Sequence, residues 1–355
     1  MQCFFEKMLP KCGCVGYNVE KKLGGDALYT ESVKRPAGEK REEWIRFLQR
    51  AGLKAEEDTQ QTVLVWDGED LIATGSRKGN LLKCIAVDPA RQGEGLTASV
   101  LTALKQEAHK EGHSHLFLYT KPRNKMLFEP LFFYPVAQTK NVLLMESLRG
   151  GIKAFLDSLE APVREGKIGA IVMNANPFTY GHQYLAETAA GECDHVYIFV
   201  LSEDKSEYSA AERMEMVKKG TAHLKNVTVL PTGPYLISEA TFPKYFLKDR
   251  ETAQREHYQL DLAVFTRWFV PHFGITHRYA GTEPNCVVTA GYNAAMEEIL
   301  PRSGVVFRQI KRRELEGAAV SASTVRAETD EDKLLKLVPR STIPYLKQRL
   351  HNKGE

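Results

Sequence analysis

The second half of the chain alternates apolar runs with helical stretches, and this alternation restricts the possible fold more than any other feature. Five strand-like runs occur there, "IGAIVMNA", "HVYIFVLS", "NVTVLPT", "HRYAG" and "GVVFRQIKR". Helical stretches such as "SAAERMEMVKKGTAH" and "TAGYNAAMEEILP" separate most of them. Repeated strand–helix units form a parallel sheet with helices on both faces. We therefore predict a doubly wound α/β domain, interrupted by a polar and aromatic insertion at 235–272.

The first half predicts a different architecture. The stretch "QTVLVWDGEDLIATGS" indicates a hairpin around Asp67 and Gly68, and "LLKCIAVDP" and "HLFLYT" are further strand candidates. Helices are expected in "EEWIRFLQRAG" and "LTASVLTALKQEAHKEG", each followed by a glycine. These patterns favour a mixed α+β domain.

The pattern changes in "RGGIKAFLDSLEAPVREGK", where paired glycines, a short helix and a proline occur together. At 355 residues the chain is long enough for two domains. We expect an extension at 1–27, the mixed domain at 28–148, a linker at 149–164 and the parallel-sheet domain at 165–351.

Composition argues against several kinds of partner. A net charge of +3 gives no broad basic field for nucleic acid, and no apolar run is long enough for a membrane span or resembles a signal peptide. Six dispersed cysteines suit a reducing compartment. Cys12 and Cys14 form a lone C-x-C without a second pair, so we predict no metal site. We expect a cytoplasmic protein that binds neither nucleic acid nor membrane.

The first strand of the second half leads into "NPFTYGH", residues 176–182. Ligands gather at the carboxyl ends of parallel strands, where helix N-termini offer free amides and a positive dipole end to phosphate. Thr179 can form a hydroxyl hydrogen bond, Gly181 lets backbone approach a ligand, and His182 can donate to a phosphoryl oxygen. The alternative is that Thr179 only caps a helix and His182 is a partly exposed surface residue.

The T-x-G-H sequence after a strand resembles the (H/T)-x-G-H signature of the nucleotidyltransferase superfamily. That superfamily carries a second signature, similar to I-S-S-T-x-x-R, at another helix start. Here "VSASTVR" follows the fifth strand and matches through Ser321, Ser323, Thr324 and Arg326. Hydroxyls at a helix start can hold the leaving phosphates, and Arg326 supplies a fixed cation.

The whole second half resembles the citrate lyase ligase family, in "NANPFTYGHQYL", "FVLSEDKSEYSAAERMEMV", "GTEPNCVVTAGYNAAM" and "VSASTVR". The resemblance implies a Rossmann-like, HxGH-type domain that uses ATP, with Mg²⁺, to activate acetate. It also implies a set of residues in the first motif that contact ATP: Asn176, Pro177, Phe178, Thr179, Gly181 and His182.

By the same resemblance, Lys205 and Arg213 lie near a phosphate or the acyl acceptor, and Gly281 and Glu283 lie on the adenosine side. The implied catalytic residues are His182, Thr179, Lys205 and Arg326. The alternative for Arg213 and Glu283 is a solvated surface pair. Wider nucleotidyltransferases often have a basic residue where Glu283 stands.

In the first half, "IAVDPARQGEGLTASVL" resembles the cofactor loop of the GCN5-related N-acetyltransferases, (Q/R)-x-x-G-x-(G/A). Gln92 and Gly95 match, whereas Thr97 replaces the final Gly or Ala. Gly93 and Gly95 leave amides free for the pyrophosphate of a coenzyme-A-like ligand. The citrate lyase ligase family shows the same order, an acetyltransferase-like domain before a nucleotidyltransferase domain.

The resemblance implies a two-step reaction. Acetate attacks the α-phosphorus of ATP to give acetyl-adenylate and pyrophosphate. The thiol of the prosthetic group on the acyl carrier (gamma) subunit of citrate lyase then takes the acetyl group and AMP leaves. We hypothesise that Gln92, Gly93 and Gly95 bind the nucleotide-like end of that group. An N-acetyltransferase, an enzyme making a dinucleotide, and a nucleotide-sensing module are the alternatives.

Overall fold

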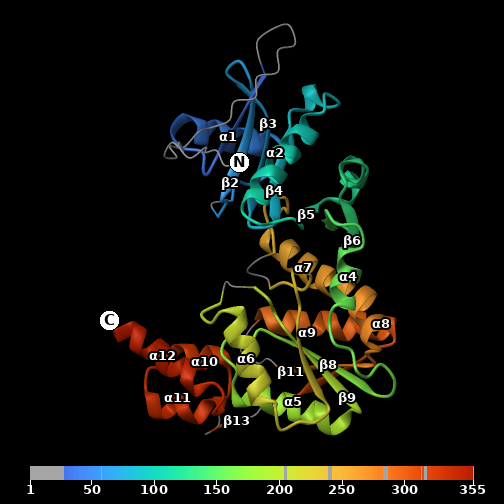
Figure 1. Cartoon of the computed structure of the whole chain (residues 1–355), viewed down its shortest axis with the longest axis vertical. Coiled ribbons are helices and arrows are strands. Elements are labelled where there is room, and N and C mark those ends of the chain that lie inside the picture. The colour runs from blue at the N-terminus through green and yellow to red at the C-terminus, as the bar shows by residue number, and fades with distance from the viewer. Residues whose placement is uncertain are drawn as a thin grey trace, which may run out of the picture. The chain divides into compact units, whose positions relative to one another are not determined.

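A computed structural model describes residues 28–56, 58–203, 206–238, 242–282, 287–312, 314–315 and 318–354 (Figure 1). The contacts divide the chain into two compact units between Tyr119 and Thr120. This division precedes the linker expected at 149–164, and the four predicted domain ranges stay predictions. The predicted extension, residues 1–27, lies outside the described residues.

The first unit is built on a mixed sheet, as its sequence predicts. The strands are β1 (Leu28–Val33), β2 (Gln61–Asp67), β3 (Asp70–Lys78), β4 (Leu81–Val87) and β5 (Phe117–Thr120). Successive pairs from β1 to β4 are antiparallel, and β4 pairs with β5 in parallel. Asp67 pairs with Asp70 across Gly68, which confirms the hairpin.

Two helices and a 3-10 turn complete this unit, α1 (Gly38–Arg50), η1 (Pro89–Arg91) and α2 (Leu96–Lys110). Helix α2 packs closely on β3, because a Cβ on Gly75 would lie 2.5 Å from a methyl of Val100. Val100 and Leu104 of α2 are fully buried there. Glycine at position 75 therefore sets how closely the helix approaches the sheet.

The second unit opens with short elements: η2 (Pro122–Asn124), α3 (Lys125–Phe128), η3 (Glu129–Leu131), β6 (Tyr134–Gln138), β7 (Leu143–Glu146) and α4 (Gly151–Asp157). Strands β6 and β7 form an antiparallel hairpin. Thr139 and Asn141 in its turn donate to the carboxylate of Glu256 in α7 (Arg250–Val264). The indole of Trp268 donates to the carbonyl of Val136 at 2.9 Å.

The five strands predicted from the alternating pattern form one parallel sheet. They are β8 (Ile168–Met173), β9 (His195–Val200), β10 (Val227–Pro231), β11 (His277–Gly281) and β12 (Val306–Ile310). Their order is β10-β9-β8-β11-β12, with every neighbouring pair parallel. The predicted doubly wound fold is confirmed. The order reverses between β8 and β11, which is where such sheets bind ligands.

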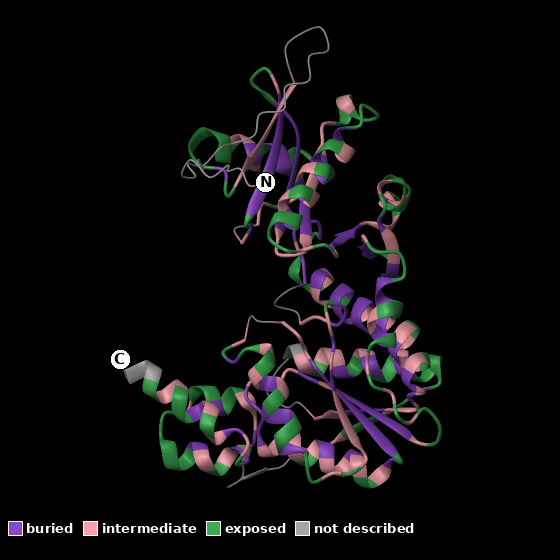
Figure 2. Ribbon diagram, in the orientation of Figure 1, coloured by how far each residue is buried: buried purple, intermediate pink, exposed green. Residues whose placement is uncertain are grey.

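Helices cover both faces of this sheet (Figure 1). On one face, Ile198 of β9 packs with α5 (Tyr180–Glu192) and α6 (Ala210–Gly220). On the other face, Phe199 lies 5.1 Å, between ring centroids, from Phe273 of α8 (Val270–Phe273). Figure 2 accordingly shows buried strands between helices whose outer faces are exposed. Such burial on two faces explains the almost continuous apolar sequence of β8 and β9.

The remaining elements of this unit are the π-helical turn η4 (Phe265–Phe269), α9 (Val287–Ile299), η5 (Leu300–Ser303), β13 (Glu314–Leu315), β14 (Ala318–Ala319), α10 (Ala322–Ala327), α11 (Glu331–Leu337) and α12 (Ile343–Gly354). Leu334 and Leu346, from α11 and α12, are buried in the same core as Phe178. No helix within the described ranges is long and apolar enough to cross a bilayer.

Candidate active site

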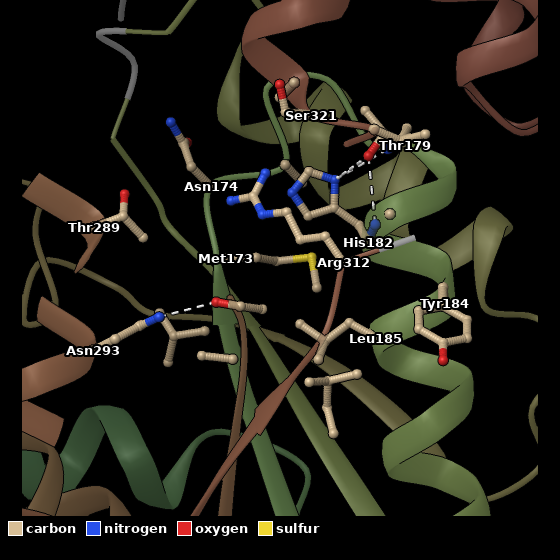
Figure 3. A pocket seen from close by; sticks show the side chains of 18 of the residues that line it. Met173, Asn174, Thr179, His182, Tyr184, Leu185, Thr289, Asn293, Arg312 and Ser321 are labelled. Carbon is tan, nitrogen blue, oxygen red and sulfur yellow. Dashed lines mark hydrogen bonds between the residues drawn. The ribbon is translucent and has the colours of Figure 1, made fainter. Parts of the chain in front are cut away.

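A cavity of about 310 Å³ opens at the carboxyl ends of β8 and β11 (Figure 3). Its walls come from β8, the start of α5, β11, α9, the end of β12 and the start of α10. Seven predicted site residues line it: Asn176, Thr179, Gly181, His182, Gly281, Ser321 and Arg326. Both sequence motifs therefore reach one cavity.

Thr179 and His182 are fixed to each other at the start of α5. Thr179 is the N-cap, and its hydroxyl accepts from the backbone N–H of His182. In return, the imidazole Nδ1 of His182 accepts from the backbone N–H of Thr179 at 3.1 Å. The capping alternative is thus correct for Thr179, but the same two side chains also line the cavity (Figure 3). Capping and ligand binding are compatible here.

The imidazole of His182 is held neutral. Its removal from water, helped by the nearby guanidinium of Arg312, lowers the pKa of His182 to about 4. Since Nδ1 accepts a hydrogen bond, the single proton of the neutral ring sits on Nε2. The ring also stacks on buried Phe178 with 5.7 Å between centroids. The result is a positioned N–H donor in the cavity wall.

The two motifs contact each other directly. A Cβ on Gly181 would lie 2.6 Å from the main-chain oxygen of Val320, so only glycine permits this approach. Arg326 donates from its guanidinium to the main-chain oxygen of Asn176, 150 residues away in sequence. The carbonyl of Phe178 also accepts from the hydroxyl of Thr342, just before α12, at 2.8 Å.

At the start of α10, Ser321 is the N-cap and accepts from the backbone N–H of Thr324 at 3.1 Å. Its hydroxyl also lies 2.8 Å from the hydroxyls of Ser323 and Thr324. Ser323 and Thr324 contact Ser321 but do not line the cavity. Pro177 and Phe178 are likewise not among the cavity lining, although Phe178 stacks on His182. Their predicted contacts with ATP stay predictions.

Several polar residues of the cavity were not predicted from the sequence: Asn174, Thr289, Asn293, Lys311 and Arg312. Arg312 donates from Nε to the carbonyl of Thr282 at 2.7 Å, and its guanidinium lies beside the His182 ring in Figure 3. Lys311 and Arg312 directly follow β12 at the carboxyl edge of the sheet, which is the signal that could have identified them. Asn293 sits in the middle of α9, where the sequence carries no comparable signal.

Arg213 is fully buried and does not line the cavity. It donates to the carbonyls of Asn174 at 3.0 Å, Leu201 at 2.7 Å and Tyr208 at 3.1 Å. It thereby ties the loop after β8 to the loop after β9. This burial excludes the alternative of a solvated surface residue, and its predicted contact with ATP stays a prediction. Lys205 and Glu283 lie outside the described residues.

In the first unit, the predicted cofactor turn is open. Gly93 and Gly95 have φ of +93° and +78°, and a Cβ on either would meet no described atom within 4 Å. Gly95 is the N-cap of α2, where no side chain forms a capping hydrogen bond. Arg91 pairs with Glu94 at 2.7 Å and with Asp67 at 2.5 Å, which fixes the turn next to exposed Gln92.

Comparison with known proteins identifies the family of this chain. The model of the citrate lyase ligase C-terminal domain matches residues 168–346, which contain both motifs and the cavity. The [citrate [pro-3S]-lyase] ligase of Klebsiella pneumoniae is 41% identical over 318 residues, covering 87% of this chain and 93% of that protein. This chain belongs to the citrate lyase ligase family. Membership confirms the family predicted from the motifs.

Further known proteins are similar to this chain. The [citrate [pro-3S]-lyase] ligase of Escherichia coli (strain K12) is 36% identical over 92% of this chain and 96% of its own length. Phosphopantetheine adenylyltransferase of Aliivibrio fischeri is 30% identical over 100 residues, covering 27% of this chain and 62% of that protein. A solved acyl-CoA N-acyltransferase from Pseudomonas aeruginosa aligns with 34% of this chain and 97% of its own, at 13% identity and a TM-score of 0.28.

Proposed function

We propose that this ligase activates acetate with ATP in the cavity between β8 and β11 and passes the acetyl group to the prosthetic group of the citrate lyase acyl carrier subunit. The observation that carries the proposal is the convergence of T-x-G-H and "VSASTVR" on one cavity in a chain of this family. Relatives named as ligases cover most of the chain, so the N-acetyltransferase and dinucleotide alternatives are not favoured.

The lining fits a nucleoside triphosphate. The cations of Lys311, Arg312 and Arg326 line the cavity together with the hydroxyls of Thr179 and Ser321. The start of α5, a helix of 13 residues, adds its dipole at the same place. We assign the phosphates to this end. We place the adenosine along Gly281 and the start of α9, where Thr289 lines the cavity and Asn293 holds the carbonyl of Gly281 at 3.0 Å.

The residues of the cavity can lower the barrier of the first step. One acetate oxygen bonds to the α-phosphorus while the bond from that phosphorus to the pyrophosphate oxygen breaks. Negative charge then grows on the phosphoryl oxygens, where Nε2–H of neutral His182 can donate and Arg326 and Arg312 supply positive charge. Arg312 thus provides a cation in the cavity whatever the role of Glu283.

Mg²⁺ is expected to accompany the triphosphate and to neutralise part of its charge. Within the described residues no three His, Cys, Asp or Glu side chains are grouped so that they could hold a metal ion. The phosphates and water would therefore supply most of its ligands. In the second step the carrier thiol attacks the acetyl carbonyl, the bond to the AMP oxygen breaks, and AMP leaves.

We also propose that the open turn of Gln92, Gly93 and Gly95 binds the nucleotide-like end of the carrier's prosthetic group. Its support is the exposed pair of glycines before α2, where an added Cβ would meet no described atom within 4 Å and no described side chain caps the helix. A cytoplasmic location remains part of the proposal. It agrees with the two described cysteines, Cys84 and Cys193, which are free thiols.

The test is acetate-dependent exchange of labelled pyrophosphate into ATP, with purified protein and Mg²⁺. We expect exchange that requires acetate and is retained in His223→Ala, an exposed histidine paired with Glu187. An enzyme that binds ATP but shows no exchange, even with the holo carrier protein present, would contradict the ligase proposal. Consumption of acetyl-CoA without ATP would instead support an N-acetyltransferase.

A further inference from the structure

The cavity lining includes a buried arginine that neither motif contains. Arg278 is the second residue of β11 and pairs in register with Ala170 of β8. Side chains alternate along a strand, and the next residue, Tyr279, packs on the α5 side with Cys193. Arg278 therefore faces the opposite side, towards α7 and α9. It is 3% exposed and lines the cavity.

The guanidinium of Arg278 is incompletely paired. Among the residues that the structure describes, its Nε and Nη1 have no hydrogen-bond partner. Its planar group instead lies 4.6 Å from the ring centroid of Phe265. The acid that acts electrostatically on Arg278 is the buried Asp261, which accepts from the hydroxyl of Tyr292.

An arginine keeps its charge even when buried, so an unpaired guanidinium here is costly unless an anion joins it. The lining also includes the apolar side chains of Val172, Ala280 and Met296, and Ala280 lies on the same face of β11 as Arg278. One cation beside apolar side chains suits a short-chain carboxylate. A triphosphate has its cations, Arg312 and Arg326, beside the two motifs at the carboxyl edge of the sheet.

We propose that Arg278 binds the carboxylate of acetate, with the methyl group against Val172, Ala280 and Met296. This assignment rests on the proposed function and adds the position of its second substrate. One carboxylate oxygen stays on the guanidinium while the other is available to attack the α-phosphorus. Because this assignment gives Arg278 to acetate and not to ATP, replacing Arg278 should weaken the binding of acetate and leave the binding of ATP unchanged.

The experiment compares Arg278→Met and Arg278→Lys with the matched surface variant Arg308→Met. Arg308 lies on neighbouring β12, half exposed and paired only loosely with Glu192 at 3.5 Å. In the exchange assay we expect the KM for acetate to rise about 30-fold or more in Arg278→Met. Arg278→Lys should give a smaller rise, and Arg308→Met none. ATP affinity, measured by calorimetry, should be unchanged in all three.

Binding of acetate is measured separately by saturation-transfer NMR on the ATP-bound protein, which needs no turnover. Acetate binding lost in Arg278→Met, with or without exchange in the wild type, supports the assignment even if the ligase proposal fails. Exchange in the wild type with an unchanged acetate KM in Arg278→Met overturns it and leaves the ligase proposal intact. Loss of ATP affinity, or no acetate binding by the wild type, also overturns it. If Arg278→Met does not fold, Arg278→Lys decides by the same criteria.

Discussion

The chain contains two strand-to-helix turns with a glycine motif, and the structure treats them in opposite ways. At the start of α5 the chain is held by its own contacts: Thr179 and His182 cap the helix, and Gly181 lies close to the backbone of Val320. At the start of α2, Gly95 stands open, with no described atom near a substituted Cβ. The contacts of the closed turn position its groups without a ligand, which suits the proposed phosphoryl transfer. The open turn leaves its backbone for a ligand to cover.

The largest loss of activity should come from removing the imidazole of His182 from the closed turn. His182→Ala removes the Nε2–H donor and the acceptor for the N–H of Thr179. We expect pyrophosphate exchange to fall about 100- to 1,000-fold, as for other lost transition-state donors. ATP affinity should change much less, since the charge of the phosphates is met by arginines. A full-rate His182→Ala enzyme would contradict the assigned role.

Two glycines within α5 can test how closely the first motif approaches the second. Gly181→Ala places a Cβ 2.6 Å from the Val320 oxygen, so the two motifs must separate. We expect a loss of about 1–3 kcal/mol in the free energy of unfolding, together with reduced exchange. Gly191→Ala, where the new Cβ meets no described atom within 4 Å, should instead stabilise by about 0.5 kcal/mol with normal exchange. Equal behaviour of the two variants would show that the contact is unimportant.

At the open turn before α2, replacing the glycine should leave the first step, the formation of acetyl-adenylate, unaffected. Gly95→Val puts a branched side chain at φ +78° and crowds the free amides. We expect the KM for the holo carrier protein to rise about 5-fold, the equivalent of one hydrogen bond. Acetate-dependent exchange should be unchanged. Gly112→Val has a similar φ of +84° at the other end of α2, so it should destabilise comparably but leave the carrier KM unaltered.

The last prediction concerns pH. The pKa of His182 is about 4 in the folded protein, below its ordinary value of 6.5, so the unfolded chain binds more protons between these values. Stability should therefore fall as pH drops from about 6.5 towards 4. His195, His272 and His277 also have lowered pKa values, so only the difference between wild type and His182→Gln isolates this group. Parallel stability profiles of the two proteins would argue against a depressed pKa.

Periodicity and turn chemistry were enough to predict the five parallel strands and the hairpin at Asp67 and Gly68. Both motifs could also be recognised in the sequence, because the residues of each motif are consecutive. Arg278 and Asn293 were not, since their place in the cavity depends on the pairing of β8 with β11 and on which face of α9 meets that edge. Arg213 shows the converse limit: the family resemblance implied that it lies near a phosphate or the acyl acceptor, whereas its described contacts are buried carbonyls. Only tertiary structure reveals those partners.

The hydrogen bond from Thr342 to the carbonyl of Phe178 spans 164 residues. During synthesis, the "NPFTYGH" turn leaves the ribosome long before the segment that completes its support. The sheet strands β8 to β12 can pair first, but the turn gains this contact only after Thr342 has emerged. A ribosome that stops just before Thr342 would thus release a protein with all five strands of this sheet and without this support for the turn.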